Sequence, residues 1–116
     1  MPHSPPVLLE DIRHAAQQIQ NFTSGRSLND YQTDDLLRAG VERLFILIGE
    51  ALGRLEKVDA GLVNQITDFR RIIGFRNVLV HGYETIDDQI VWQTIQQHLP
   101  ILKDQVEKLL GRFGPP

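Results

Sequence analysis

The residues best suited to chemistry lie in one short segment, RRIIGFRNVLVHGY, which runs from Arg70 to Tyr83. Within it, Arg76, Asn77, His81 and Tyr83 form the pattern R-N-x-x-x-H-x-Y. Histidine is the side chain that gives and takes protons near neutral pH. Arginine offers planar, paired donors to phosphate or carboxylate groups. Arg76 and His81 together therefore suit proton transfer beside a negatively charged group.

The charge of the whole chain gives these residues little help in binding a polyanion. The chain has 12 Lys and Arg against 15 Asp and Glu, a net charge of −3. Proteins that bind nucleic acids are typically basic, because neutralising phosphates supplies most of their affinity. Any such binding must depend on a local cluster, and the candidates are Arg70, Arg71 and Arg76.

Length and composition predict one small domain without disulfides or metal–thiolate sites. The chain has 116 residues and no cysteine, which also excludes a cysteine nucleophile. A single domain over residues 7–112 is expected, with flexible Pro-rich ends at 1–6 and 113–116. The N-terminal residues do not follow the pattern of a signal peptide, and no apolar run is long enough for a membrane span. We therefore expect a cytoplasmic protein.

Apolar residues recur at helical spacing throughout the chain, and no segment alternates as a strand would. Four helical blocks are expected, at residues 7–22, 31–55, 62–81 and 89–110. The predicted fold is all-α, an up-down bundle of four to five helices.

Glycine, proline and short polar residues mark the expected ends of these blocks. Asn29 or Asp30 is expected to cap the second block, and Asp87 or Asp88 the last. The third block is expected to break near Gly74 and to stop at Gly82 in a left-handed conformation. Pro100 predicts a kink or break near Leu99.

The second block is apolar on more than one face, which in so short a chain suggests burial against a second subunit. Gly49 and Gly53 lie inside it at i, i+4 spacing, which allows another helix to approach closely. Glu50 lies between the two glycines, and its carboxylate either pairs with an arginine or is solvated.

The spacing of Arg76 and His81 also bears on oligomerisation. At about 100° per residue they lie roughly 140° apart around one helix, so they would not naturally face the same phosphate. Asn77 and His81 do share a face. A site built from two subunits across a two-fold axis would bring Arg76 of one to His81 of the other. A long flexible arginine, or a helix that unwinds before His81, would do the same within one chain.

The pattern R-N-x-x-x-H-x-Y resembles the R-x(4–6)-H signature of HEPN ribonucleases, in the form found in the HepT-like toxins. Three segments are similar to that family's second, catalytic and last helices: IGEAL at 48–52, DFRRIIGFRNVLVHGY at 68–83 and IVWQTIQQHLPIL at 90–102. The resemblance covers roughly residues 8–110.

The resemblance implies a HEPN-like dimer that cleaves RNA without a metal or cofactor. The ribose 2′-hydroxyl would be the nucleophile, a cyclic phosphate would result, and Arg76 and His81 would be catalytic. Asn77 would support them. Arg70 and Arg71 either contact RNA phosphates or lie on a solvated face. Tyr83 matches a tyrosine that accepts AMP from a small nucleotidyltransferase antitoxin of the MntA type.

Two other functions fit the same fold. The chain could be a non-catalytic, substrate-binding partner subunit of a nucleotidyltransferase, or a helical interaction module whose site has decayed. The intact R-N-x-x-x-H-x-Y pattern counts against the decayed site. Only a measurement of activity separates the toxin ribonuclease from the partner subunit.

Overall fold

The fold is known from a computed structural model that describes residues 4–82 and 86–114. Over those residues it contains helices and no strand. The helices are α1 (Pro5–Thr23), α2 (Leu28–Gln32), α3 (Asp35–Val58), α4 (Ala60–Val63), α5 (Phe69–His81), α6 (Asp88–Gln93), the π-helix η1 (Thr94–His98) and α7 (Leu99–Gly111). The predicted all-α helical bundle is confirmed.

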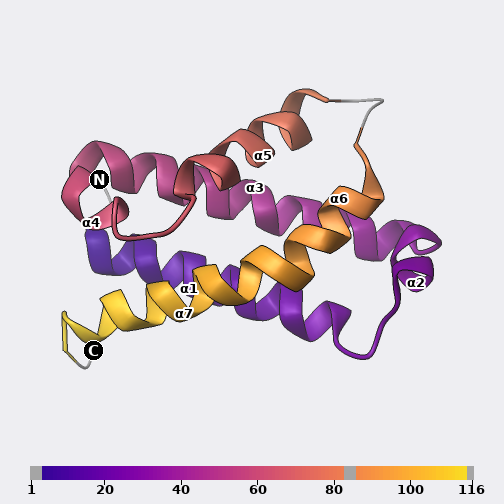
Figure 1. Cartoon of the computed structure of the whole chain (residues 1–116), viewed down its shortest axis with the longest axis horizontal. Helices are drawn as coiled ribbons and strands as arrows, with labels where there is room; N and C mark the ends of the chain where they lie inside the picture. Colours follow the sequence, from indigo (N-terminus) through magenta and orange to yellow (C-terminus); the bar gives the residue numbers. More distant parts are fainter. Residues whose placement is uncertain (1–3, 83–85, 115–116) are drawn as a thin grey trace.

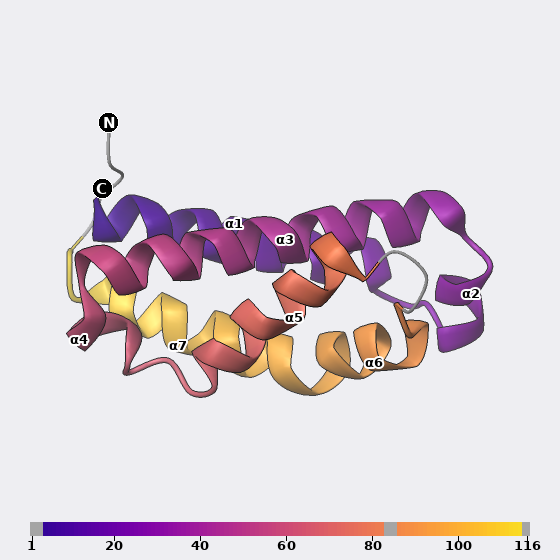
Figure 2. The ribbon, with the colours of Figure 1, turned by 90° about the horizontal axis from the view of Figure 1, so that it is seen from above.

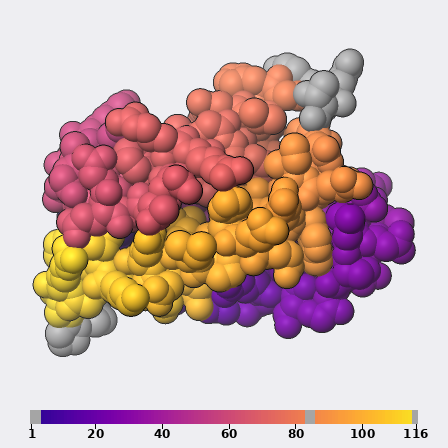
Figure 3. Space-filling model, viewed as in Figure 1, coloured from indigo at the N-terminus to yellow at the C-terminus, as the bar shows by residue number. Residues whose placement is uncertain are grey.

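Helix α3 is the centre of this arrangement. It packs against α1 on one side and α5 on another, while α7 packs against α1 and continues α6 and η1 (Figures 1 and 2). Helix α5 contacts mainly α3 and runs along one edge of the molecule (Figure 3). Among the described residues, no helix is both long and apolar enough to cross a membrane.

Most apolar residues of α3 are buried within the chain itself, although Leu36, Leu47 and Val58 are exposed. Leu37, Val41, Phe45, Ile48 and Leu52 all lie in the core, covered by α1 and α5. The two-sided apolar pattern is thus explained inside one subunit, and it is not by itself evidence for a second.

The second predicted block is two helices rather than one. Ser27 caps α2, with Asp30 returning the second bond of a capping box, so the prediction of Asn29 or Asp30 as the cap was wrong. Tyr31 belongs to this short helix and is fully buried. The Asp34 side chain accepts from the Leu37 amide and starts α3 anew.

The third block breaks earlier than predicted. The chain leaves α4 at Asn64 and starts α5 after Asp68, whose φ of 57° is left-handed, while Gly74 lies inside α5. Gly82 does end α5, but with φ −83°, so the predicted left-handed stop was wrong. A Cβ at Gly82 would lie 2.4 Å from the Val78 carbonyl oxygen, and this close approach is what requires glycine.

The last block follows the prediction more closely. Asp87 caps α6, its side chain accepting from the Gln89 amide. The wider π-helix η1 then precedes Leu99 and Pro100. A proline ring would clash with the carbonyl four residues earlier in a regular helix, and a π-turn relieves that clash. In place of the break predicted near Leu99, the helical residues run on from Asp88 to Gly111 and only the helix type changes, at the π-helix η1.

Candidate active site

Arg76 is held against α3 by a glycine. A Cβ built on Gly49 would lie 2.3 Å from the Cβ of Arg76 and 2.6 Å from its Cγ. No side chain larger than hydrogen fits there, so the stem of Arg76 lies directly on the α3 backbone. The close packing predicted for Gly49 is confirmed, and its partner is α5. The same prediction for Gly53 was wrong, because no atom lies within 4 Å of its Cβ position.

The guanidinium of Arg76 is held by two neighbours. Its Nη1 donates to Asn77 Oδ1 at 2.9 Å, and its Nη2 donates to Glu50 Oε1 at 3.3 Å. The Arg76 side chain is 28% exposed and that of Glu50 is 34% exposed. Arg76 Nε is buried without a hydrogen-bond partner among the described residues. The head group is therefore oriented, yet it keeps unused N–H donors.

One aromatic contact fixes the register of the two helices beside Arg76. Phe45 of α3 and Phe75 of α5 meet edge to face, with ring centroids 5.1 Å apart. This geometry is a favoured one for aromatic pairs. Because Phe75 precedes Arg76 and Phe45 is one turn before Gly49, the ring pair and the arginine stem lock the same stretch of α5 onto α3.

His81 lies apart from this contact. It is the last residue of α5, is exposed, and makes no hydrogen bond or ion pair that involves another described residue. The hollow around Arg76 is lined without His81. A single chain thus does not bring the two predicted catalytic residues together, in agreement with their separation around the helix.

The other predicted site residues are placed as follows. Asn77 contacts Arg76 rather than His81. Arg70 is ion-paired with Glu56 of α3 at 2.7 Å. Arg71 lines a separate crevice between the start of α5 and α7, and Arg76 is not part of that crevice. Tyr83, the predicted AMP acceptor, lies outside the described residues.

A hollow of about 400 Å³ lies between α3 and α5 beside Arg76. Glu50, Gly53, Arg54 and Lys57 border it from α3, and Arg76 and Asn77 border it from α5. Arg54 and Lys57 were not predicted as site residues. The sequence contained a sign of them, because positions 50, 54 and 57 lie on one face of a helix and this spacing puts Arg54 and Lys57 on the same side as Glu50.

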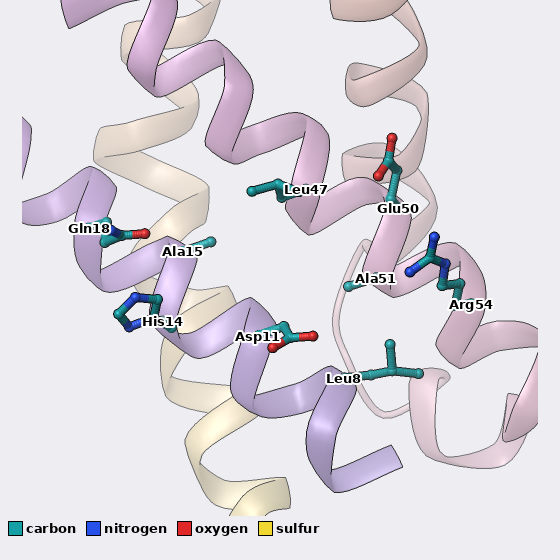
Figure 4. A pocket seen from close by; sticks show the side chains of 9 residues that line it. All are labelled: Leu8, Asp11, His14, Ala15, Gln18, Leu47, Glu50, Ala51 and Arg54. Atoms are coloured by element: carbon teal, nitrogen blue, oxygen red, sulfur yellow. The ribbon is translucent and has the colours of Figure 1, made fainter. Parts of the chain in front are cut away.

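A second groove, of about 270 Å³, lies between α1 and α3. Figure 4 shows Glu50 and Arg54 one turn apart on α3, with Asp11 and His14 opposite them on α1. Glu50 and Arg54 line both hollows, so they stand on the ridge between them.

Comparison with known proteins decides what kind of chain carries this site. The model of the family described as "Ribonuclease HepT-like" matches residues 12–109. The chain belongs to this family. The HepT-like match takes in α3 and α5 completely, and with them Gly49, Glu50, Arg76 and His81.

Several relatives support the same assignment. A protein of Thermococcus cleftensis described as "Probable ribonuclease HepT" is 31% identical over 101 residues, which are 87% of this chain and 91% of the relative. A protein of Caldanaerobacter subterraneus subsp. tengcongensis, whose description proposes an RNase, is 29% identical over 94% of this chain and 96% of its own. No solved structure matches the chain. The predicted enzyme class, a ribonuclease, is that of the HepT-like family.

Proposed function

We propose that this HepT-like chain is the toxin of a toxin–antitoxin system and a metal-independent endoribonuclease. Arg76 and His81 are its catalytic residues, joined at the interface of a homodimer. The observation that carries the proposal is the way Arg76 is held. Its aliphatic stem packs on Gly49, and its guanidinium is hydrogen-bonded to Glu50 and Asn77. A fixed cation with spare donors is what stabilises charge that develops in a transition state.

The proposed reaction is an internal transfer at phosphorus. The ribose 2′-oxygen attacks the adjacent phosphorus as it loses its proton, and the bond to the 5′-oxygen of the next nucleotide breaks. The products are a 2′,3′-cyclic phosphate and a 5′-hydroxyl. His81 exchanges the protons of this reaction, and Arg76 donates hydrogen bonds to the phosphorus-bound oxygens.

The test of this assignment is RNA cleavage by purified protein in buffer with chelator. His81→Ala and Arg76→Ala should each lower the rate by about 10²–10⁴-fold, the usual contribution of acid–base help. His14→Ala is the matched control, because His14 is exposed on α1, and it should cleave at the native rate.

Native rates in either site variant would reject the catalytic pair. Loss of native activity with chelator would reject the metal-independent mechanism. A wild-type chain without any activity would favour the alternative of a non-catalytic partner of a nucleotidyltransferase.

Regulation at Tyr83 is the second part of the proposal. Tyr83 is two residues beyond His81 in the sequence. AMP groups added there by a nucleotidyltransferase antitoxin would place negative charge beside the arginines and exclude RNA by repulsion and occlusion. Intact-mass measurement after co-expression with such an enzyme should find AMP adducts that are absent from Tyr83→Phe. Adducts that persist in Tyr83→Phe, or modified protein that still cleaves, would reject this part.

A further inference from the structure

The hollow between α3 and α5 gathers positive charge in an otherwise acidic chain. Arg54, Lys57 and Arg76 border it, against the single carboxylate of Glu50. Glu50 is already engaged with Arg76 at 3.3 Å. The charges of Arg54 and Lys57 are therefore uncompensated within the hollow.

Arg54 and Lys57 are two of five cations without an ion pair among the described residues, with Arg43, Arg71 and Arg112, and of these five only they line this hollow. Ion pairs hold Arg13, Arg26, Arg38, Arg70, Lys103 and Lys108, each with a nearby carboxylate. Arg54 and Lys57 have no hydrogen bond or ion pair with any described residue, and both are exposed. Surface cations without carboxylate partners, placed on one wall of a hollow, are arranged as in sites that take phosphate groups.

Gly53 lines the hollow, and its position is referred to below as the floor. No atom lies within 4 Å of where a Cβ of Gly53 would be, so the α3 backbone is open at this point. Asn77 Oδ1 accepts from Arg76, which leaves the Asn77 amide N–H groups available as donors. Glycine at the floor and donors on both walls suit a tetrahedral anion.

We propose that this hollow binds a backbone phosphate of the RNA next to the one that is cleaved, with Arg54 and Lys57 as its cations. The proposal rests on the proposed ribonuclease function and adds a binding subsite to it. The scissile phosphate lies at Arg76, and the neighbouring phosphate of the same strand lies towards Lys57. The chain thereby holds a polyanion in spite of its net charge of −3.

The test measures RNA binding apart from cleavage. A fluorescent 2′-O-methyl oligoribonucleotide lacks the nucleophile and cannot be cut, so its affinity for the full-length chain can be titrated at several salt concentrations. Arg54→Gln and Lys57→Gln should each weaken binding at low salt by on the order of tenfold. Each should also flatten the dependence of log affinity on log salt by about 0.7, the value for one phosphate contact on a single strand.

Two further variants separate site binding from general charge. Lys108→Gln removes one positive charge from α7, outside the hollow, and it should leave the affinity nearly unchanged. Gly53→Leu fills the open floor without changing charge, and it should weaken binding. Thermal unfolding followed by circular dichroism checks that every variant is folded.

Several results would overturn the subsite. One is an Arg54→Gln/Lys57→Gln double variant that binds with native affinity and salt slope. Another is equal weakening by Lys108→Gln. A third is a double variant that loses dimers in light scattering, since the cations would then contact a second subunit. Cleavage of unmodified RNA by the wild-type chain is scored separately. Failure there rejects the proposed function, while the binding series still decides the subsite.

Discussion

The aliphatic stem and the guanidinium of Arg76 are fixed by different residues. Gly49 removes the space in which the stem would move, while Glu50 and Asn77 orient the guanidinium. A long side chain loses considerable rotamer entropy when it is held. In this chain the rotamer entropy of Arg76 is lost when the protein folds, so it is not lost again during the reaction. A cation oriented in advance in this way favours catalysis.

Glu50 is accordingly expected to position Arg76 and not to stabilise the fold. Its ion pair is about one-third exposed, and such pairs contribute little to stability. We predict that Glu50→Gln lowers kcat by on the order of tenfold, equal to about 1.4 kcal/mol, with KM and the unfolding midpoint little changed. Steady-state cleavage kinetics and urea unfolding measure both quantities.

Glu56→Gln is the matched control for this prediction. Glu56 is on the same helix and forms a shorter ion pair, 2.7 Å, with Arg70. It should lose a similar amount of stability and keep the native kcat. Glu50→Asp should recover part of the rate, because the carboxylate is retained. A native kcat in Glu50→Gln would show that Asn77 and Gly49 suffice to hold the arginine.

Glu42 gives the fold a pH dependence of its own. Burial, and secondly the charge of Asp88, raise the pKa of Glu42 above its ordinary value of 4.5. The folded state thus favours the protonated carboxyl, and this stability is lost as the pH rises through the folded pKa. We predict that Glu42→Gln melts at a higher temperature than the wild type at about pH 8 and at the same temperature near pH 4.

Glu10 provides a control of opposite sign. A hydrogen bond from Arg13 lowers the pKa of Glu10, so its contribution is present at neutral pH and lost in acid. Glu10→Gln should therefore melt at the same or a lower temperature at about pH 8. If Glu42→Gln and Glu10→Gln shift the melting curve in the same direction at that pH, the assignment of Glu42 is wrong.

At the scale of elements, the contact of α3 with α5 decides where Arg76, the proposed catalytic arginine, lies. This contact includes the Phe45–Phe75 ring pair and the Gly49–Arg76 approach. Helix α5 packs mainly against α3, so little else holds it in register. A change at this contact should move the arginine as well as lower stability.

Two glycines of α3 should respond in opposite ways to the same substitution. At Gly49 a Cβ meets Arg76 at 2.3 Å, so Gly49→Ala should cost about 1–3 kcal/mol in overpacking, only partly offset by better helix propensity. At Gly53 the Cβ meets nothing within 4 Å, so Gly53→Ala should gain up to about 1 kcal/mol. Urea unfolding of the two variants measures both signs. Equal effects would mean that the close approach at Gly49 relaxes freely.

The elements differ in how far the sequence predicted them. Helical periodicity located every long helix, because the apolar faces are buried inside one chain. It missed the breaks before α3 and α5, where Asp34 caps a new helix and Asp68 adopts a left-handed φ. Local residues that cap or turn the backbone interrupt a helix without interrupting its apolar spacing, so periodicity alone does not detect them.

The candidate site was predictable to a similar degree, and its catalytic role stays a prediction. Arg76 and His81 follow from residue type and spacing within one helix. The roles of Glu50 and Gly49 depend on which helix packs on α3, and that is a tertiary contact between residues 26 and 27 positions apart in the sequence. Arg54 and Lys57 became candidates only once the hollow had been located beside Arg76.

At the scale of the whole molecule, part of the surface of α3 and α5 remains apolar. Leu36 is 84% exposed, Leu47 on the same face of α3 is 39% exposed, and Val78 of α5 is 50% exposed. Burying these residues would favour association. Val78 lies between Arg76 and His81 on α5, so a second subunit that covers Val78 would also lie beside the proposed catalytic residues. A dimer at micromolar concentration is therefore expected in light scattering, and a monomer would reject this assembly.

A mixture of two inactive variants tests whether the site spans two subunits. Arg76→Ala retains His81, and His81→Ala retains Arg76. If each site takes one residue from either subunit, a heterodimer of the two variants has one intact site out of two. Random exchange of equal amounts makes half of the dimers mixed, so about one quarter of the wild-type activity should return.

The variants are co-refolded from urea, and RNA cleavage is compared with each variant refolded alone. If Arg76 and His81 act within one subunit, every site in the mixture lacks a residue and no activity returns. That result would reject the composite site and favour a rearranged end of α5 that brings His81 to Arg76 of the same chain.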